Sequence, residues 1–269
     1  MSSDTRLTDG SAPRSVAKVE RPLTRRHARA GSVGGVDLHA RVVEDVGQRI
    51  VDGELAAGDI IFADQLCESL QISRSVVREG LRTLGSLGMV QSRPQRGTRV
   101  QPLSHWDLLS PYVIRWRGQG PYHVAQMSEL LELRLGVERA AAYFATTRMT
   151  AEEIAAMTRA AADMRTAFDA NDMFGFFRAD AELHRAMLEG SGNPVIAQFA
   201  DTVAAQLSLR GATGARSYTP HGISRASVDR HIALVEAIAR GDRDSATELA
   251  EQIIVATIAE VESMPEFRS

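Results

Sequence analysis

The chain has 269 residues, 44% of them hydrophobic and 5% aromatic, and a formal net charge of -3 at pH 7. This length exceeds that of most single domains, and an apolar content made mainly of Ala, Leu, Val and Ile favours helices over a β-sandwich. Because Cys67 is its only cysteine and no apolar run suits a signal peptide or a membrane span, we exclude an intrachain disulfide and expect a mainly α, cytoplasmic protein.

Charge is distributed unevenly along the chain. Residues 71–101 contain six arginines and one acid, Glu79, whereas from Pro121 onward 21 acids face 14 basic residues. Local charge decides association with nucleic acid more than the total does. The sequence therefore predicts a basic module joined to an acidic one.

Residues 1–35 are rich in Ser, Arg, Thr and Gly and show no helical or strand periodicity. This composition predicts a disordered N-terminal arm. Its segment "RPLTRRHARAG" carries four arginines. These arginines are compatible either with contacts to DNA phosphates or with a solvated tail.

Residues 36–101 show three helical segments followed by two short strands. In "VDLHARVVEDVGQRIVDGEL" one face carries Leu38, Val42, Val43, Val46 and Ile50. Two shorter helices, in "FADQLCESLQI" and "SRSVVREGLRTLGSLG", are separated by about three residues, with Ser73 as N-cap and Val76, Val77, Leu81 and Leu84 facing inward. "MVQSRPQRGTRV" predicts a two-stranded wing. The order of elements predicts a winged helix-turn-helix.

A connector at 102–122 carries prolines at 102, 111 and 121, and Trp106, Leu109, Val113 and Trp116 predict one or two docked helical turns within it. From 123 to 263 amphipathic helices are predicted at 124–147, 150–169, 171–189, 194–212, 223–240 and 242–262. Their expected boundaries are a Thr150–Glu153 capping box, Asn171 as a cap, "GSGNP" and "RGDRD". We expect an all-α bundle of six helices that can enclose a pocket.

The third helix has the features of a DNA recognition helix, whose N-terminal residues meet base edges in the major groove. Arg74, Ser75 and Arg78 share an outward face, and Arg96 and Gly97 form the tip of the wing, which would approach the DNA backbone or minor groove. A solvated basic face is the alternative reading of this helix alone. The ordered helix, turn, basic helix and wing favour double-stranded DNA as the partner.

A possible metal site begins in "DAELHRAMLEGSGNP", where Asp180 and His184 stand four residues apart and share one face of a helix. Two ligands rarely hold a metal tightly, so a third must come from elsewhere. His231, in "SVDRHIALVEAI", is the candidate. A histidine beside an apolar face is more often a hydrogen-bonded core residue, but the acid at 180 favours a cation.

Three ordered motifs give the chain a family resemblance. "GELAAGD", "SRSVVREGLRTLGSLGMV" and "RGTRV" resemble the winged helix of GntR-family bacterial transcription regulators. "ELRLGVERAAA" and "DAELHRAMLEGSGNP" resemble the all-helical ligand domain of its FadR/FCD subgroup, so that the resemblance covers about residues 37–262. Within this subgroup, the tryptophan-containing connector and the spacing are most similar to the galactonate-responsive repressors of sugar-acid catabolism.

The resemblance implies roles for particular residues. Asp180, His184 and His231 match three of the four protein ligands common in the subgroup's metal sites. The fourth, a histidine about 22 residues before His231, is replaced by Leu209 and Arg210, with His221 as a substitute candidate. Arg134 lies where the subgroup places an inward arginine that would hold an effector carboxylate, although an ion pair with Glu138 is an equally good reading.

The sequence also departs from the family pattern before the second helix. It reads "GDIIFADQL", one residue shorter than usual, with Asp64 where a phosphate-binding arginine often stands. Operator affinity or spacing could therefore differ from that of the relatives.

The leading hypothesis is a homodimeric transcription regulator that binds an operator, and repression is the behaviour that we expect from the family. Its effector would be a small carboxylate, either a sugar acid or a hydroxy acid, bound at a metal site. His and carboxylate ligands suit Zn, Mn or Ni. The competing hypotheses are a metal-dependent hydrolase, which would lack a visible general base, and a metal-independent sensor of acyl ligands.

Overall fold

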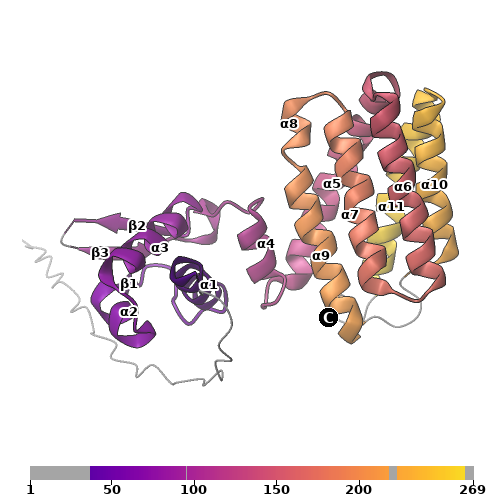
Figure 1. Cartoon of the computed structure of the whole chain (residues 1–269). Coiled ribbons are helices and arrows are strands. Elements are labelled where there is room, and N and C mark those ends of the chain that lie inside the picture. The colour runs from indigo at the N-terminus through magenta and orange to yellow at the C-terminus, as the bar shows by residue number, and fades with distance from the viewer. Residues whose placement is uncertain (1–36, 95, 218–222, 264–269) are drawn as a thin grey trace, which may run out of the picture. The chain divides into compact units, whose positions relative to one another are not determined.

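The computed structural model describes residues 37–94, 96–217 and 223–263, and most of these residues are helical (Figure 1). The N-terminal arm predicted at 1–35 and the substitute ligand His221 lie outside the described residues. In the part that is described, no helix combines the length and apolar character needed to cross a bilayer.

The first part of the described chain is the predicted winged helix-turn-helix. Its elements are α1 (Leu38–Val51), β1 (Ile60–Ile61), α2 (Ala63–Leu70), α3 (Arg74–Ser86), β2 (Val90–Arg93) and β3 (Gly97–Val100). The apolar spacing of α1 buries Val42, Val43, Val46 and Ile50 as predicted. Leu38 was expected on the same face but is 43% exposed, because it begins the helix one turn before the first core position.

The wing is larger than the sequence predicted. Three antiparallel strands lie in the order β1-β3-β2, and Ile60 and Ile61 of β1 pair with Arg99 and Thr98 of β3. The two predicted strands are β2 and β3, and the prediction missed β1 because a strand of two residues shows no alternation. Gly97 begins β3 at φ +79°, and a Cβ there would lie 2.6 Å from Cγ2 of Ile60. Glycine is thus required by both backbone conformation and space.

The turn between α2 and α3 has the predicted length of three residues. Gln71 adopts a left-handed conformation at φ 56° and ends α2. Ser73 occupies the N-cap position of α3 as predicted, but its hydroxyl bonds the Ser75 hydroxyl at 3.1 Å rather than a backbone N–H.

The connector contains a 3₁₀ turn (Leu103–His105) and α4 (Pro111–Arg117). Val113 and Trp116 of α4 are buried, whereas Leu109, which was expected to dock with them, is 40% exposed because it precedes the helix. Trp116 is 1% exposed, and its Nε1–H donates to Oε2 of Glu44 on α1 at 2.8 Å. Its ring lies against Gly47, where a Cβ would be only 2.5 Å from the ring. The tryptophan therefore occupies the space that a side chain at position 47 would need.

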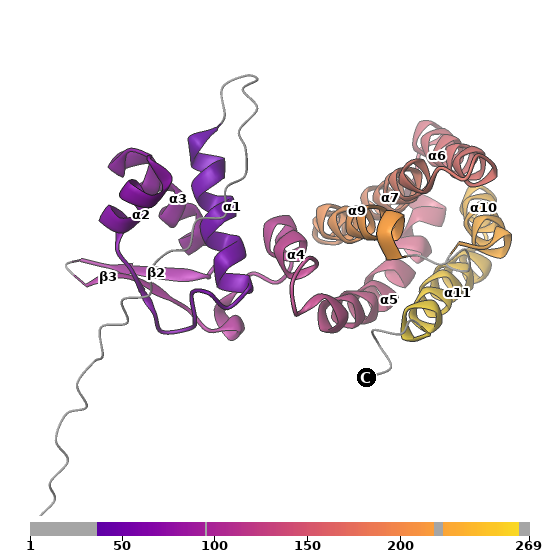
Figure 2. The same cartoon turned by 90° about the horizontal axis from the view of Figure 1, so that it is seen from below.

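The remaining helices form the predicted all-α bundle. They are α5 (His123–Arg148), α6 (Ala151–Asp169), α7 (Met173–Gly190), α8 (Pro194–Ala197), α9 (Ala200–Ser217), α10 (Arg225–Ala239) and α11 (Arg243–Glu262). The six long helices surround a common interior, in the order α5, α11, α10, α6, α7 and α9, and α5 also packs on α7 (Figure 2). Small and flexible side chains, including Ala160, Met157, Met164 and Met187, fill this core.

Two expected boundaries in the bundle were wrong. The Thr150–Glu153 capping box is present, but the cap of α7 is Asp172, which accepts the Gly175 N–H at 2.9 Å, while Asn171 takes φ 55° in the preceding turn. The helix predicted at 194–212 is split into α8 and α9. There the Phe199 N–H bonds the Ile196 carbonyl at 3.0 Å, a tighter 3₁₀ pattern that interrupts the α-helix.

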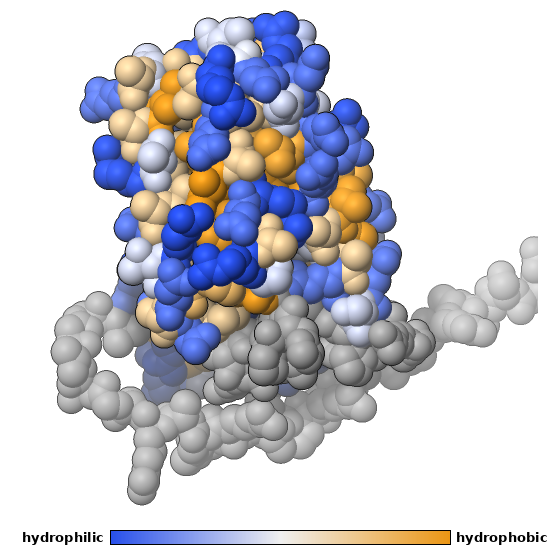
Figure 3. All heavy atoms as spheres, turned by 90° about the vertical axis from the view of Figure 1, so that its right-hand side faces the viewer, coloured by the Kyte–Doolittle hydropathy of each residue, from blue (hydrophilic) through white to orange (hydrophobic). Residues whose placement is uncertain are grey.

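The outer surface of the bundle follows from the amphipathic helices. Figure 3 shows mainly hydrophilic residues, with hydrophobic residues between them, on the side where α6 and α10 are drawn in Figure 1. Scattered exposed apolar residues of this kind are normal for a folded protein.

Replacing Gly47 by Ala should lower stability although alanine is the better helix former. The Trp116 ring would have to move, and such overpacking costs about 1–3 kcal/mol, more than the gain of about 1 kcal/mol in helix propensity. Gly136→Ala is the matched control, because nothing lies within 4 Å of the added Cβ in α5. Thermal unfolding should show a lower midpoint for the first variant and an equal or higher one for the second. A midpoint that rises in both would contradict the close packing of Trp116 on α1.

Candidate DNA-reading surface and metal centre

The N-terminal end of α3 exposes the three residues expected to meet DNA. Arg74, Ser75 and Arg78 are exposed, whereas Val77 and Leu81 of the same helix are buried. The first turn of α3 itself contains no acidic residue, so the partial positive charge of the helix N-terminus adds to the charges of Arg74 and Arg78. This end of the helix suits an anionic partner.

The expected wing tip also presents exposed positive charge. Arg96 is exposed in the turn before β3, and Gly97 begins that strand.

The sequence analysis missed one contact at the start of α3: Nη2 of Arg74 lies 2.7 Å from Oδ1 of Asp64 in the first turn of α2. The pattern held no signal for this pair, because it forms across the turn between two helices.

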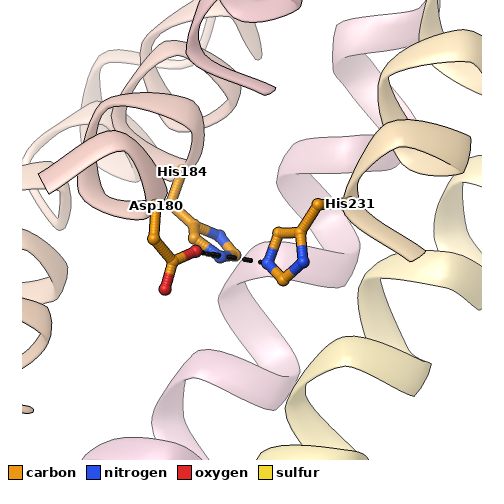
Figure 4. A group of neighbouring side chains, drawn as sticks. All are labelled: Asp180, His184 and His231. Carbon is orange, nitrogen blue, oxygen red and sulfur yellow. Dashed lines mark ion pairs between the residues drawn. The ribbon is translucent and has the colours of Figure 1, made fainter. Parts of the chain in front are cut away.

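Inside the bundle, the three residues singled out as metal ligands lie together (Figure 4). Asp180 and His184 come from α7 and His231 comes from α10, and each is 5% exposed or less. Nε2 of His184 and Nε2 of His231 each lie 3.2 Å from Oδ1 of Asp180. One ligand atom from each of the three residues lies within 4.8 Å of the other two. This spacing suits coordination of a single cation.

The outer ring nitrogens of both histidines have acceptor oxygens beside them. Nδ1 of His184 lies 2.6 Å from Oε2 of Glu138, and Nδ1 of His231 lies 2.7 Å from the Ser227 carbonyl. We infer that Nδ1 carries the proton in each neutral ring, which leaves the Nε2 lone pairs directed at the cluster. Carboxylate and carbonyl partners of this kind orient histidines that bind metals.

Three atoms of the cluster are buried and complete no hydrogen bond among the described residues: Oδ1 of Asp180, Nδ1 of His184 and Nε2 of His231. Nδ1 of His184 is nevertheless in ion-pair contact with Oε2 of Glu138, whereas Oδ1 of Asp180 and Nε2 of His231 face each other inside the cluster. A buried polar atom without a partner costs about 1–3 kcal/mol. A cation bound between these atoms would remove this cost, so the residues fit a divalent metal.

Neighbouring charges shift the pKa values of the buried groups in this site. Burial alone would lower the pKa of His184, but the carboxylates of Glu138 and Asp180 raise it to about 9. Burial would raise the pKa of Asp180, yet the two imidazoles beside it hold that pKa well below its usual range.

Arg134 makes the expected ion pair and also faces the cluster. Its Nε–H donates to Oε1 of Glu138 at 2.6 Å, its Nη1 donates to Gln206 at 3.2 Å, and its Nη2 lies 3.4 Å from Nε2 of His184. Burial would raise the pKa of Glu138, but Arg134 and His184 lower it to about 2. The two readings of Arg134 are therefore compatible.

A cavity of about 20 Å³ adjoins the cluster, with walls from α5, α7, α9, α10 and α11. Its polar lining is Arg134, Asp180, His184, Arg210, Ser227, His231, Thr257 and Glu260. This volume holds an ion or about one water molecule.

Sequence reasoning noted Arg210 only as a neighbour of the missing histidine and overlooked Glu260. Nη2 of Arg210 donates to Oε2 of Glu260 at 3.0 Å, and the guanidinium lies over the Phe177 ring. Burial raises the pKa of Glu260, against the effect of Arg210. The segment "QLSLRG" holds no pattern that indicates Arg210, because its contact with Glu260 is made by tertiary packing.

Comparison with known families accounts for both regions of the chain. Residues 38–100 match the family described as bacterial regulatory proteins, gntR family, and residues 129–256 match the FCD domain. The first match covers the winged helix-turn-helix, and the second covers most of the bundle, including Asp180, His184 and His231.

Relatives among characterised proteins are transcription regulators. The chain is 29% identical over 219 residues to the galactonate operon transcriptional repressor of Escherichia coli K12, covering 81% of this chain and 93% of that protein. It is 29% identical over 242 residues to the transcriptional repressor NanR of Salmonella arizonae, covering 84% and 85%.

Solved structures share the fold. The Listeria monocytogenes protein Lar, described as controlling expression of the agr system, aligns with a TM-score of 0.58 at 16% identity, over 85% of this chain and 98% of its own. McbR/YncC of E. coli aligns with a TM-score of 0.50 at 18% identity, over 84% and 98%.

We expect divalent metal to stabilise the protein through the three-residue cluster. At 100-fold excess over the dissociation constant, binding adds about 2.7 kcal/mol, which raises the unfolding temperature of a chain of this size by about 5–10 °C. Asp180→Ala should abolish this rise for Zn, Mn and Ni. Asp201→Ala, which removes an exposed acid paired with Arg185, should retain it. Equal rises in both variants, measured by differential scanning fluorimetry after chelation, would show that the metal binds elsewhere.

Proposed function

The chain belongs to the gntR family of bacterial transcription regulators and carries an FCD domain, and from this premise we propose that it is a repressor controlled by a small carboxylate. The proposed effector is a sugar acid or hydroxy acid bound beside the buried cluster of Asp180, His184 and His231. That cluster, with Arg134 directed at it, is the observation that carries the proposal. The hydrolase alternative is not supported, because the matched families and relatives are regulators rather than enzymes.

The DNA-binding part of the proposal concerns residues 36–101. Arg74, Ser75 and Arg78 would meet base edges or phosphates in the major groove, and Arg96 and Gly97 would approach the backbone or minor groove. Two copies of the chain, joined through residues 123–263 in the bacterial cytoplasm, would bind the two halves of a pseudo-palindromic operator.

The metal part of the proposal assigns Asp180, His184 and His231 as protein ligands. Two imidazole nitrogens and a carboxylate suit Zn, with Mn and Ni as alternatives. A cation bound by three side chains would supply positive charge and open coordination positions for oxygen atoms of the effector. Glu138 and the Ser227 carbonyl would keep both imidazoles oriented.

The charge of the site favours an anionic effector. The ligands and their partners include two arginines and three carboxylates, namely Arg134, Arg210, Glu138, Asp180 and Glu260. Arg230 adds a further positive charge beside Glu260. A divalent cation with neutral histidines would add two more positive charges to the site, and these would attract an effector carboxylate. Arg134, whose Nη2 is turned to the cluster, would donate to it.

The Arg210–Glu260 pair favours an effector that also carries hydroxyl groups. A hydroxyl both donates and accepts, so a guanidinium and a carboxylate side by side can satisfy it completely. The same charged wall makes an acyl chain a poor occupant, because an apolar tail would cover these charged groups without offering them any further hydrogen bond. The name of the galactonate operon repressor, one of the relatives, agrees with this class of effector.

Effector binding would have to enlarge the site, since about 20 Å³ is far less than a sugar acid occupies. The helix most directly coupled to the connector is α9, whose Gln206 holds Arg134 and whose Thr202 hydroxyl donates to the Leu109 carbonyl at 2.8 Å. A shift of α9 would therefore reach α4, and α4 contacts α1 through Trp116 and Glu44. An effector that prefers the shifted arrangement would change DNA binding.

DNA binding should be specific and sensitive to salt. In a gel shift with DNA from upstream of its own gene, wild-type protein should bind in the range of about 10⁻⁸–10⁻¹¹ M, and affinity should fall steeply as salt increases. Arg78→Ala should weaken this binding about tenfold or more, whereas Arg185→Ala in α7 should not change it. Affinity that salt does not alter would refute the assignment.

Effector binding should depend on Arg134 and Glu260 in different ways. Arg134→Lys keeps a charge beside Glu138 but loses the planar donor pair, so it should weaken every carboxylate effector about tenfold. Glu260→Gln should weaken a six-carbon polyhydroxy acid but not a short 2-hydroxy acid that cannot reach it. Calorimetry with metal-loaded protein would measure both series. Equal losses for the long and short acids in Glu260→Gln would refute the hydroxyl-reading role.

A further inference from the structure

The first arginine of the recognition helix is held by an acid from a different helix. Arg74 begins α3, Asp64 lies in the first turn of α2, and Nη2 of the arginine is 2.7 Å from Oδ1 of the acid. Gln71, with its left-handed backbone, makes the turn that brings the two helix N-termini together.

Fold stability gives little reason for this pair. Both side chains are largely exposed, 70% for Arg74 and 64% for Asp64, and an exposed ion pair adds about 0–1 kcal/mol. Against DNA the carboxylate has an electrostatic cost, since it brings a negative charge towards the phosphates. An acid at this place therefore needs another explanation.

The geometry of the Arg74–Asp64 pair supplies an explanation for the acid. A free arginine side chain has many rotamers and readily turns to a phosphate, which carries no sequence information. A guanidinium has five N–H donors in a fixed plane, so Asp64 can hold Nη2 while other donors remain for a base. Guanine accepts two such donors at O6 and N7 in the major groove. Fixing the plane beforehand lowers the entropy lost when both bonds form.

We propose that Asp64 is a positioning residue that fixes Arg74 to read one guanine in each half of the operator. The inference rests on the proposed DNA-binding function. Asp64 lowers affinity for DNA in general and raises the preference for one base. Without it, Arg74 turns to the backbone and adds a phosphate contact.

The test is selection of binding sites from a random DNA pool by the full-length protein, followed by affinity measurements at several salt concentrations. Wild type should select a motif with one guanine preferred about tenfold at a position where Arg74→Ala shows no preference. Asp64→Ala should reduce that preference to about threefold or less. Its affinity for unrelated DNA should stay equal or rise. The slope of log affinity against log salt concentration should become steeper by the amount expected for about one more phosphate contact.

Two further variants separate positioning from folding or charge. Asp64→Asn keeps one acceptor oxygen and should give an intermediate preference. Asp45→Ala removes an acid from α1 that pairs with Arg49, so it makes the same change of charge in the same domain and should select the wild-type motif. Thermal unfolding would verify that all variants fold.

Three results would overturn the proposal: an unchanged motif in Asp64→Ala, equal weakening on every sequence, or an unchanged motif in Arg74→Ala. A different result bears on the proposed function itself. If wild type selects no motif and binds DNA without salt dependence, the chain does not read DNA, and the positioning role fails with it.

Discussion

A carboxylate enclosed in an apolar core must be matched by cations on its own oxygens, and the bundle is organised around one such group. Glu138 is completely buried on α5 and has Arg134 at one oxygen and His184 at the other. The second contact ties α5 to α7 and fixes the ring of His184, which in turn faces Asp180. From there the chain of polar contacts reaches His231 on α10. Removing any one partner would leave charge buried without compensation, so the site and the packing of three helices depend on the same contacts.

The parts of the fold and of the site that could be predicted were those marked by a local pattern in the sequence. The spacing of Asp180 and His184 fixed a shared helix face, and the turn of three residues before Arg74 fixed the helix-turn-helix. His231 was predictable only as a candidate, since its position depends on how α10 packs against α7. Arg210 and Glu260, which are 50 residues apart on α9 and α11, gave no pattern to detect, and β1 was too short to alternate. Contacts made by tertiary packing, rather than by helix or strand periodicity, were the ones missed.

Two acid–arginine pairs of the described residues differ in burial, one in the bundle and one in the winged helix-turn-helix. In the bundle, the side chains of both Arg134 and Glu138 are buried. Loss of either one would leave the other as an unpaired buried charge, so the pair must stay together. At the start of α3, Arg74–Asp64 is exposed, and water can replace either partner at small cost. The buried pair thus suits a permanent scaffold for a ligand site, whereas the exposed pair leaves the remaining guanidinium donors of Arg74 accessible to another molecule.

The connector also gives the protein an optical property. Its two tryptophans, Trp106 and Trp116, are the only ones in the chain and both lie between the winged helix and the long helices of the bundle. Trp106 donates to the Gln101 carbonyl at 2.9 Å, and the Trp116 indole is shielded from water beside Gly47. Indole emission depends on hydration and on the hydrogen bond at Nε1, so the tryptophan fluorescence of the unlabelled protein, excited separately from that of its four tyrosines, reports on this segment alone. A shift in the wavelength of maximum tryptophan emission when a small molecule enters the bundle would therefore record movement at the connector, with no dye attached and no DNA present.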